Sequence, residues 1–193
     1  MGAAVGIVLF FPFMAFVAVG IAWSDGFPIL FTQERVGRNF RTFKMLKFRT
    51  MKRNAEVTLQ EWKSDDDPLW HRYVSNNFKL PHDPRTLPFG TFLRRYSLDE
   101  LPQLWNVLRG DMSLVGPRPL LRCELPEYDC EKNVYGCVRP GITGLWQVSG
   151  RSSTRFSDRA SLDQVYVANL SFLGDCKILL RTVPTCLTGI GAY

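Results

Sequence analysis

Two adjacent carboxylates stand among arginines in the stretch from Arg94 to Leu104, which reads RRYSLDELPQL. Asp99 and Glu100 form the pair, and Arg94 and Arg95 precede it. Arginine forks bind phosphate oxygens, and a carboxylate can attack phosphorus or hold a divalent metal ion. This stretch therefore predicts chemistry on a phosphate group.

A local structural role is the alternative interpretation of the same residues. Ser97 and Glu100 have the S-x-x-E spacing of a capping box, which would satisfy free amides at a helix start. Pro102 weakens this interpretation, because in a helix capped at Ser97 it would remove a backbone hydrogen bond. We expect a helix from Ser97 to Leu108, or one that begins nearer Leu101, ended by Gly110. Either start leaves both carboxylates at a helix N-terminus, where the dipole favours anions.

The two carboxylates suit different tasks. An aspartate is ionised at neutral pH, so Asp99 could attack a phosphorus atom without a general base. On a helix Glu100 would point about 100° away, and it could hold Mg²⁺ against the same diphosphate. Lys47, Arg49 and Arg118 offer further positive charge. A Walker loop and a G-x-G-x-x-G motif are both missing from the sequence, which argues against the common nucleotide folds.

The segment from Gly2 to Trp23 contains no charged residue. As a helix it would extend about 33 Å, close to the roughly 30 Å of a bilayer core. All 24 Lys and Arg residues follow it, which places the rest of the chain in the cytoplasm by the positive-inside tendency. Pro12 would bend this helix, so a kinked spanning helix and a hairpin that leaves by the face it entered both stay open.

The remaining chain is long enough for one domain with its own core. Basic and apolar residues alternate between Phe40 and Met51, as in a strand or an interfacial segment with phosphate-facing cations, or in a solvated basic face. We expect a helix from Asn54 that Pro68 stops, a charged loop from Gln33 to Arg38, and helical periodicity from Leu162 to Val183. These last helices could lie on a membrane surface or pack onto the core.

The net charge of +6 favours an anionic partner. A nucleic-acid interface is disfavoured, because it would need a long cationic stripe without an apolar anchor beside it. The five cysteines form an odd set without C-x₂-C spacing, so we expect reduced thiols rather than a zinc site.

The chain resembles the bacterial sugar transferases, also called monotopic phosphoglycosyl transferases. The matching segments cover nearly the whole chain: residues 33–37, 47–51, 83–85, 93–104, 106–119 and 139–151. They include the sequences QERVG, KFRTM, DPR and NVLRGDMSLVGPRP.

The resemblance implies a fold and a reaction. The fold would be α/β and helix-rich, with a re-entrant membrane helix-hairpin at residues 1–28, kinked at Pro12. A compact cytosolic catalytic domain with surface amphipathic helices would follow at residues 29–193. The reaction would move a sugar-1-phosphate from a UDP-sugar to undecaprenyl phosphate at the cytoplasmic face of the bacterial inner membrane.

The resemblance also implies residue roles. Asp99 would be the nucleophile that forms a covalent phospho-sugar intermediate, and Glu100 would bind Mg²⁺. Phosphate-binding residues would be Lys47, Arg94 and Arg118. The basic segment from Arg139 to Arg151 would add a binding loop, in which Arg139 and Arg151 would also bind substrate phosphates. The active form could be a homodimer.

The segment WQVSGR at residues 146–151 looks like the branch that transfers hexose-1-phosphate, commonly galactose. Members of that branch often carry extra membrane helices ahead of the catalytic part, so the apolar start at Gly2 suggests a shortened version. Phe40 stands where many relatives have glycine, which predicts a differently shaped loop after Arg38.

Overall fold

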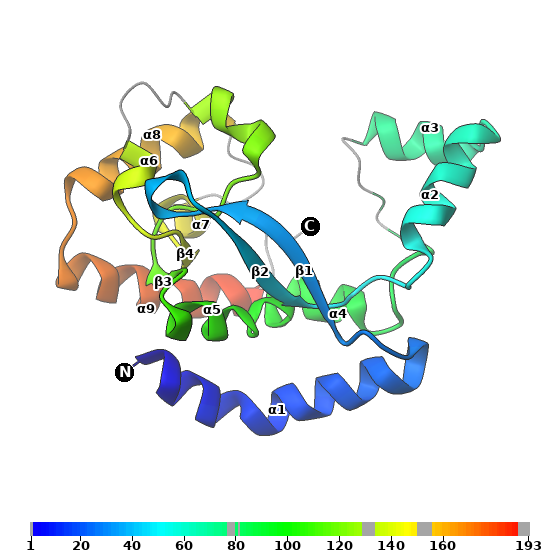
Figure 1. Cartoon of the computed structure of the whole chain (residues 1–193), viewed down its shortest axis with the longest axis horizontal. Coiled ribbons are helices and arrows are strands. Elements are labelled where there is room, and N and C mark those ends of the chain that lie inside the picture. The colour runs from blue at the N-terminus through cyan, green and yellow to red at the C-terminus, as the bar shows by residue number, and fades with distance from the viewer. Residues whose placement is uncertain (1, 77–79, 81, 129–133, 150–155, 189–193) are drawn as a thin grey trace.

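The computed structural model describes residues 2–76, 80, 82–128, 134–149 and 156–188, and Figure 1 shows their arrangement. Its strands are β1 (Leu30–Val36), β2 (Thr42–Phe48), β3 (Ser113–Val115) and β4 (Gly141–Thr143). Its α-helices are α1 (Gly2–Asp25), α2 (Ala55–Ser64), α3 (Pro68–Ser75), α4 (Gly90–Arg95), α5 (Gln103–Arg109), α6 (Val134–Cys137), α7 (Leu145–Ser149), α8 (Phe156–Ala168) and α9 (Phe172–Thr188). Short 3₁₀ turns are η1 (Arg38–Phe40), η2 (Leu98–Glu100) and η3 (Arg122–Tyr128). The expectation of a helix-rich α/β fold is confirmed.

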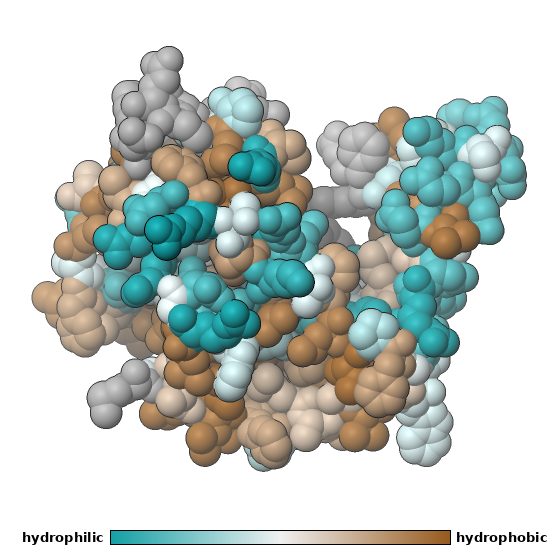
Figure 2. All heavy atoms as spheres, in the orientation of Figure 1, coloured by the Kyte–Doolittle hydropathy of each residue, from teal (hydrophilic) through white to brown (hydrophobic). Residues whose placement is uncertain are grey.

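The apolar N-terminal segment forms a single helix, α1, with Pro12 inside it. It is long and apolar enough to cross a membrane, and among the described residues it is the one helix that meets this test. Val17 and Ile21 of α1 are buried in one hydrophobic cluster with Phe48, Leu87 and Leu93. Most of its other large side chains are exposed, and Figure 2 shows the apolar surface that they form along α1. This surface suits contact with lipid.

The basic alternating segment forms β2, which pairs with β1 in an antiparallel hairpin running from Leu30 opposite Phe48 to Val36 opposite Thr42. The prediction of a strand is confirmed. The charged loop expected from Gln33 to Arg38 is wrong, because its first residues extend β1 up to Val36. The charged composition of this segment indicated a loop, but pairing with β2 holds its backbone in a strand.

Helix α5 is fixed to β2 by the fully buried side chain of Asn106. Its Oδ1 accepts a hydrogen bond from the Leu46 N–H at 3.0 Å, and its Nδ2 donates to the Lys44 carbonyl at 2.9 Å. One amide therefore satisfies the backbone of the strand edge and sets the distance between the two elements. Gly110 ends α5 with a φ of 83°, as expected from the sequence.

Helix α2 ends at Ser64, just before the acidic run at residues 65–67, and a second helix follows that run. Pro68 is the first residue of α3, and the Asp67 carboxylate accepts from the Leu69 N–H at 2.7 Å. The expected stop at Pro68 is therefore wrong, since proline is favoured at the first position of a helix. Helices α2 and α3 form a lobe beside the main body (Figure 1).

The DPR sequence anchors this lobe. The Arg85 guanidinium lies 4.8 Å from the Trp62 ring centre and 4.9 Å from that of Tyr73. Its Nη2 also lies 2.6 Å from Asp83 Oδ2. Cation–π contacts of this kind are strongest when the cation is desolvated, and Arg85 is buried.

The other end of the molecule gathers α6, α7, α8 and α9 around a short parallel sheet in which β3 pairs with β4 (Figure 1). Val115, Tyr166 and Ile178 form its core. Helix α9 buries Ile178 but leaves apolar side chains exposed at residues 172, 173, 180, 183 and 187. Packing onto the core therefore describes one face of α9, and the other face is apolar and exposed.

Candidate active site

A cavity of 1560 Å³ lies between the β1–β2 hairpin, α1, the turn at η2 and the β3–β4 region. The sequence-predicted residues Lys47, Arg94, Asp99, Glu100 and Arg118 all line it. They come from three segments of the sequence, at Lys47, at residues 94–100 and at Arg118, and the fold brings these segments to one cavity. The cavity also reaches Gly2, Gly6 and Phe10 of α1, so its wall includes the apolar helix.

Asp99 lies in η2 and is only 8% exposed. Burial raises the pKa of its carboxyl group to about 6, and the neighbouring Glu100 charge adds to this effect. Lys47 and Arg94 act in the opposite direction. A buried carboxylate with two cations beside it has lost much of its hydration, so it is suited to attack an electrophile brought to it.

The capping box, which was the alternative interpretation of Ser97 and Glu100, is not formed. Ser97 has a φ of 57°, and its side chain makes no capping hydrogen bond. Pro102 precedes the first residue of α5, which begins at Gln103. The helix predicted from Ser97 is therefore wrong at its start, and the alternative start nearer Leu101 is the better description. Asp99 and Glu100 are consequently held in the turn ahead of α5.

Glu100 makes an ion pair with Lys47, whose Nζ lies 2.7 Å from Oε1 of the carboxylate. Lys47 comes from β2, so this pair links the hairpin to η2. Both side chains are about one quarter exposed and border the cavity. This ion pair places the Lys47 ammonium group directly beside Asp99 and Glu100.

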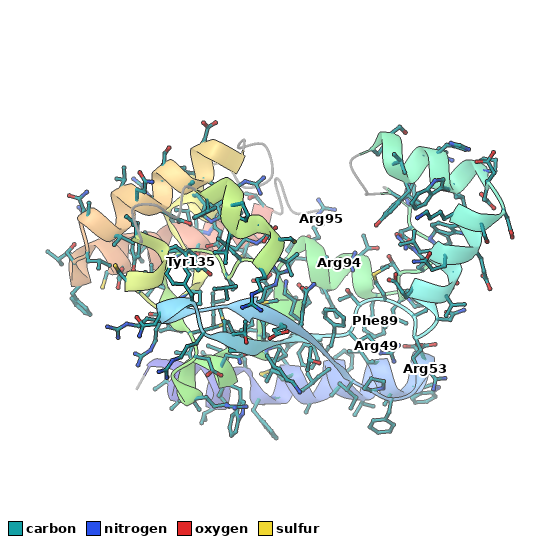
Figure 3. All side chains as sticks on the ribbon, turned by 45° about the horizontal axis from the view of Figure 1, so that its top comes forward. Arg49, Arg53, Phe89, Arg94, Arg95 and Tyr135 are labelled. Carbon is teal, nitrogen blue, oxygen red and sulfur yellow. The ribbon has the colours of Figure 1, made fainter. Side chains whose placement is uncertain are left out.

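Arg94 reaches the cavity from α4, where Figure 3 labels it beside Arg95. Its Nε donates to Thr50 Oγ1 at 2.8 Å, and Thr50 is buried at the end of β2. Arg95 instead lies 5.8 Å from the Tyr96 ring centre and is not among the residues that line the cavity. The local hydrogen bond thus selects which of the two arginines faces the site.

Arg118 lies in the turn after β3, between two prolines. This turn packs tightly on β4, because a Cβ atom at Gly116 would lie 2.5 Å from the Arg139 carbonyl oxygen. Pro117 also accepts a hydrogen bond from the Gly141 N–H at 2.8 Å. The backbone that carries Arg118 is therefore fixed on both sides.

Arg139 and Arg151 differ from the other predicted phosphate-binding residues. Arg139 is exposed, lies near Gly110 at the end of α5, and is not among the residues that line the cavity. Arg151 lies outside the described residues. The structure therefore brings Lys47, Arg94 and Arg118 together with the carboxylates, but not Arg139.

Arg49, which was expected to offer charge to a phosphate, lines the cavity, and its guanidinium also binds the end of α1. Its guanidinium pairs with the Asp25 carboxylate and donates to the carbonyls of Gly26 and Pro28, each at 2.6 Å. Arg49 and Arg53 appear together at this end of α1 in Figure 3. The Arg49 guanidinium therefore attaches α1 to the end of β2.

The residues around Glu100 fit one kind of Mg²⁺ site, in which the substrate supplies some of the ligands. Among the described residues there is no group of three or more His, Cys, Asp or Glu side chains that could hold a metal ion alone. Mg²⁺ is often bound by one or two carboxylates together with substrate phosphates and water. Glu100 beside a cation-lined cavity with room for a diphosphate satisfies that requirement, whereas the acidic run at residues 65–67 is a solvated turn.

Sequence reasoning missed the supporting polar residues Arg35, Thr50 and Asn106. Each is buried and connects two elements around the cavity. Arg35 and Thr50 lie in the QERVG and KFRTM sequences but had no assigned role. In the sequence these residues could be recognised as polar side chains within apolar or regularly patterned segments, because such a side chain is buried only with a hydrogen-bond partner.

Comparison with known proteins shows which family the chain belongs to. Residues 1–189 match the model of the family described as bacterial sugar transferase. The chain is 44% identical over 192 residues to the UDP-galactose-lipid carrier transferase of Erwinia amylovora, covering 100% of this chain and 40% of that protein. It is 41% identical over 191 residues to the exopolysaccharide production protein ExoY of Sinorhizobium fredii, covering 99% of this chain and 84% of that protein.

A third relative is the undecaprenyl-phosphate galactose phosphotransferase of Salmonella typhimurium. It is 44% identical over 169 residues, which are 88% of this chain and 35% of that protein. The chain thus spans less than half the length of some curated relatives and most of the length of others. The matched residues include every segment that builds the cavity, and the chain belongs to the bacterial sugar transferase family.

Proposed function

We propose that this protein transfers hexose-1-phosphate from a UDP-sugar to undecaprenyl phosphate, giving a polyprenyl diphosphate sugar for cell-surface polysaccharide synthesis. The observation that carries the proposal is the buried Asp99 carboxylate, in a cavity lined by Lys47, Arg94 and Arg118 and bordered by an apolar helix. Family membership and the names of the relatives support the same class of reaction.

The reaction would proceed in two displacements. An Asp99 oxygen attacks the β-phosphorus of the UDP-sugar, the new O–P bond forms, and the bridging P–O bond breaks. Its electron pair stays on the phosphate of UMP, which leaves. An oxygen of undecaprenyl phosphate then attacks the same phosphorus, breaks the aspartyl O–P bond and restores the carboxylate.

The surrounding residues would hold the substrate for this attack. Lys47 and Arg94 both line the cavity and lower the pKa of Asp99, and they would bind the oxygens of the phosphoryl group that it attacks. Glu100 would hold Mg²⁺ together with diphosphate oxygens, after Lys47 moves from its present pairing. When bound, this ion neutralises negative charge on the diphosphate.

The membrane would supply the second substrate. Residues 1–28 would anchor the chain as a re-entrant helix at the inner membrane, and residues 29–193 would form the catalytic domain on the cytoplasmic face. The lipid phosphate would reach the cavity along α1, whose Gly2, Gly6 and Phe10 border it. The exposed apolar side chains of α9 would contact the bilayer surface.

Galactose is the sugar that the relatives favour, with glucose as the second candidate. Two of the three relatives described above carry galactose in their names. The WQVSGR segment favours the same branch.

Trapping of the intermediate tests the covalent mechanism. The full chain in lipid nanodiscs is incubated with Mg²⁺ and UDP-hexoses labelled at the β-phosphate, with and without undecaprenyl phosphate. We expect UMP release and label on Asp99, with release abolished in Asp99→Asn and strongly reduced in Glu100→Gln. Asp158→Asn, an exposed carboxylate on α8, is the matched control. Label on another residue, or turnover by Asp99→Asn, contradicts the mechanism.

A membrane-tethered binding module of the same fold is the alternative from another class. It predicts that UDP-sugars bind without release of UMP under any of these conditions. The same assay therefore separates the two proposals.

A further inference from the structure

Two arginines form a pair that the proposed attack on phosphorus does not use. Arg35 comes from β1 and Arg118 from the turn after β3, and both line the cavity that contains Asp99. Burial lowers the pKa of Arg35, and the positive charge of Arg118 lowers it further. Arginine nevertheless stays ionised in proteins, so two positive charges stand close together here.

The carboxylate that faces this arginine pair compensates for part of its charge. Glu124 Oε2 lies 3.5 Å from Arg35 Nη1 and also accepts from the Leu121 N–H at 2.6 Å. Among the described residues no carboxylate lies within ion-pair distance of Arg118. The arginine pair therefore carries more positive than negative charge at the cavity wall, which favours an anion there.

The hydrogen bonds of Arg35 show how the pair is held. Its Nη1 donates to the Pro119 carbonyl at 3.1 Å, and its Nη2 donates to Gln33 Oε1 at 2.6 Å. Arg35 thus fixes the residue next to Arg118 from a side chain that is itself 7% exposed. Its Nε has no hydrogen-bond partner among the described residues, which leaves one buried donor unused.

The arginine pair lies near the carboxylates without binding them. Glu100 contributes to the electrostatic environment of Arg35, whereas Asp99 is influenced by Lys47 and Arg94. The cations proposed to act at the reacting phosphorus, Lys47 and Arg94, come from β2 and α4, whereas the arginine pair comes from β1 and the turn after β3. A nucleoside diphosphate sugar has two phosphates, one that carries the sugar and one that carries the nucleoside.

We propose that the arginine pair is the subsite for the second phosphate, the one that leaves on UMP, with Arg118 as its ligand and Arg35 as a positioning residue. This inference rests on the proposed function, because it assigns the leaving group of that reaction. Breaking the bridging P–O bond adds a negative charge to the UMP phosphate. Preorganised guanidinium groups would stabilise that charge as it develops.

Binding of UMP and of uridine to the full chain in nanodiscs tests this subsite, measured by calorimetry over a range of salt concentrations. We expect Arg118→Ala to weaken UMP binding about tenfold, with uridine binding changed less than about twofold. Arg35→Lys keeps the charge but loses the fork, and should weaken UMP binding by a few-fold. Arg122→Ala, an exposed arginine on η3 that does not line this cavity, is the matched control.

Glu124→Gln separates an anion subsite from a merely structural cluster. The amide can still accept from the Leu121 N–H, but the negative charge is gone. We expect UMP binding to tighten by about two- to fivefold at low salt and to return toward the wild-type value at high salt. A structural role predicts weaker or unchanged binding instead. Glu124→Gln also leaves the buried Arg35 side chain in place, so its effect on UMP binding does not arise from the loss of that side chain.

The outcomes distinguish the two levels of the argument. If the wild-type chain neither binds UMP nor releases it from any UDP-hexose, the proposed function fails. If the wild type binds and releases UMP while Arg118→Ala and Glu124→Gln bind it unchanged, the subsite alone is refuted. Equal losses for UMP and uridine also refute it, because the affected contacts would then be with the nucleoside.

Discussion

Lys47 Nζ lies 2.7 Å from Glu100 Oε1, so the carboxylate proposed as a metal ligand already has a cationic partner. The two residues come from different elements, β2 and η2. Lys47 also lowers the pKa of Asp99, so one ammonium group influences both carboxylates. Its position suits two successive tasks, balancing Glu100 in the free protein and binding phosphate oxygens when substrate arrives.

Removal of this ammonium group should impair catalysis more than folding. We expect Lys47→Met to reduce UMP release by about 10- to 100-fold, since a charge-assisted contact contributes roughly 1.5–3 kcal/mol. Lys44→Met is the control, because Lys44 is exposed on the same strand and does not line the cavity. Initial rates of UMP release with saturating UDP-sugar measure the effect. Equal rates for the two variants would exclude Lys47 from the reaction.

Thr50 should act on substrate binding through Arg94. In Thr50→Val the hydrogen bond to Arg94 Nε is lost, while the shape of the side chain is kept. We expect KM for the UDP-sugar to rise about fivefold, which corresponds to roughly 1 kcal/mol, with kcat changed little. Thr50→Ser keeps the hydroxyl group and should restore KM. A loss of kcat at constant KM would contradict this positioning role.

Asp163 gives a prediction on pH and stability. Burial raises the pKa of this α8 carboxyl group to about 7, against the opposing hydrogen bonds from the Tyr128 hydroxyl and the Arg118 backbone. The folded protein therefore holds this proton over a pH range in which the unfolded chain releases it. The stabilisation is complete below about pH 4 and is lost as pH rises through about 7.

Asp163→Asn should remove this pH dependence. We expect the Tm of the wild type, relative to that of the variant, to fall by about 3 °C or more between pH 5 and pH 8. Thermal unfolding followed by circular dichroism measures the difference. Asp158→Asn, an exposed carboxylate on the same helix, should show no such trend. A difference in Tm that is constant with pH would contradict the raised pKa.

Asn106 should be essential for stability although it is not proposed to touch substrate. In Asn106→Leu the Leu46 N–H and the Lys44 carbonyl lose their partner in a buried position. We expect the free energy of unfolding to fall by about 2–4 kcal/mol, measured by chemical denaturation. Asn169→Leu, an exposed asparagine beyond α8, should cost less than about 1 kcal/mol. Similar losses for both variants would show that the buried amide has no special role.

Much of this site could be predicted from the sequence because its parts are local. The carboxylate pair, the arginine between two prolines and the alternating basic strand are each visible in a short segment. The apolar helix is equally plain, since nothing but its length and composition is needed. All of these elements form, and Lys47, Asp99, Glu100 and Arg118 from them line one cavity.

What could not be predicted depends on contacts between distant segments. Arg49 carries the same charge as Lys47 and lies two residues away, yet it binds the end of α1 because Asp25 and three backbone carbonyls face it. Pro68 starts a helix where the sequence indicated a stop, because proline suits both positions. Arg139 resembles the other basic residues in its motif, but the packing of β4 leaves it outside the cavity. Partners, rather than residue types, decide these cases.

The attachment of α1 by Arg49 has a mechanical consequence. Arg49 follows β2 directly and holds the last residues of the apolar helix, while Lys47 on the same strand reaches Glu100. Tilting of α1 must therefore strain this junction or displace the strand that carries the ammonium group. In the membrane-anchored arrangement that we propose, a change in bilayer thickness that alters the tilt of α1 would act on the geometry at Asp99 without any change in substrate concentration.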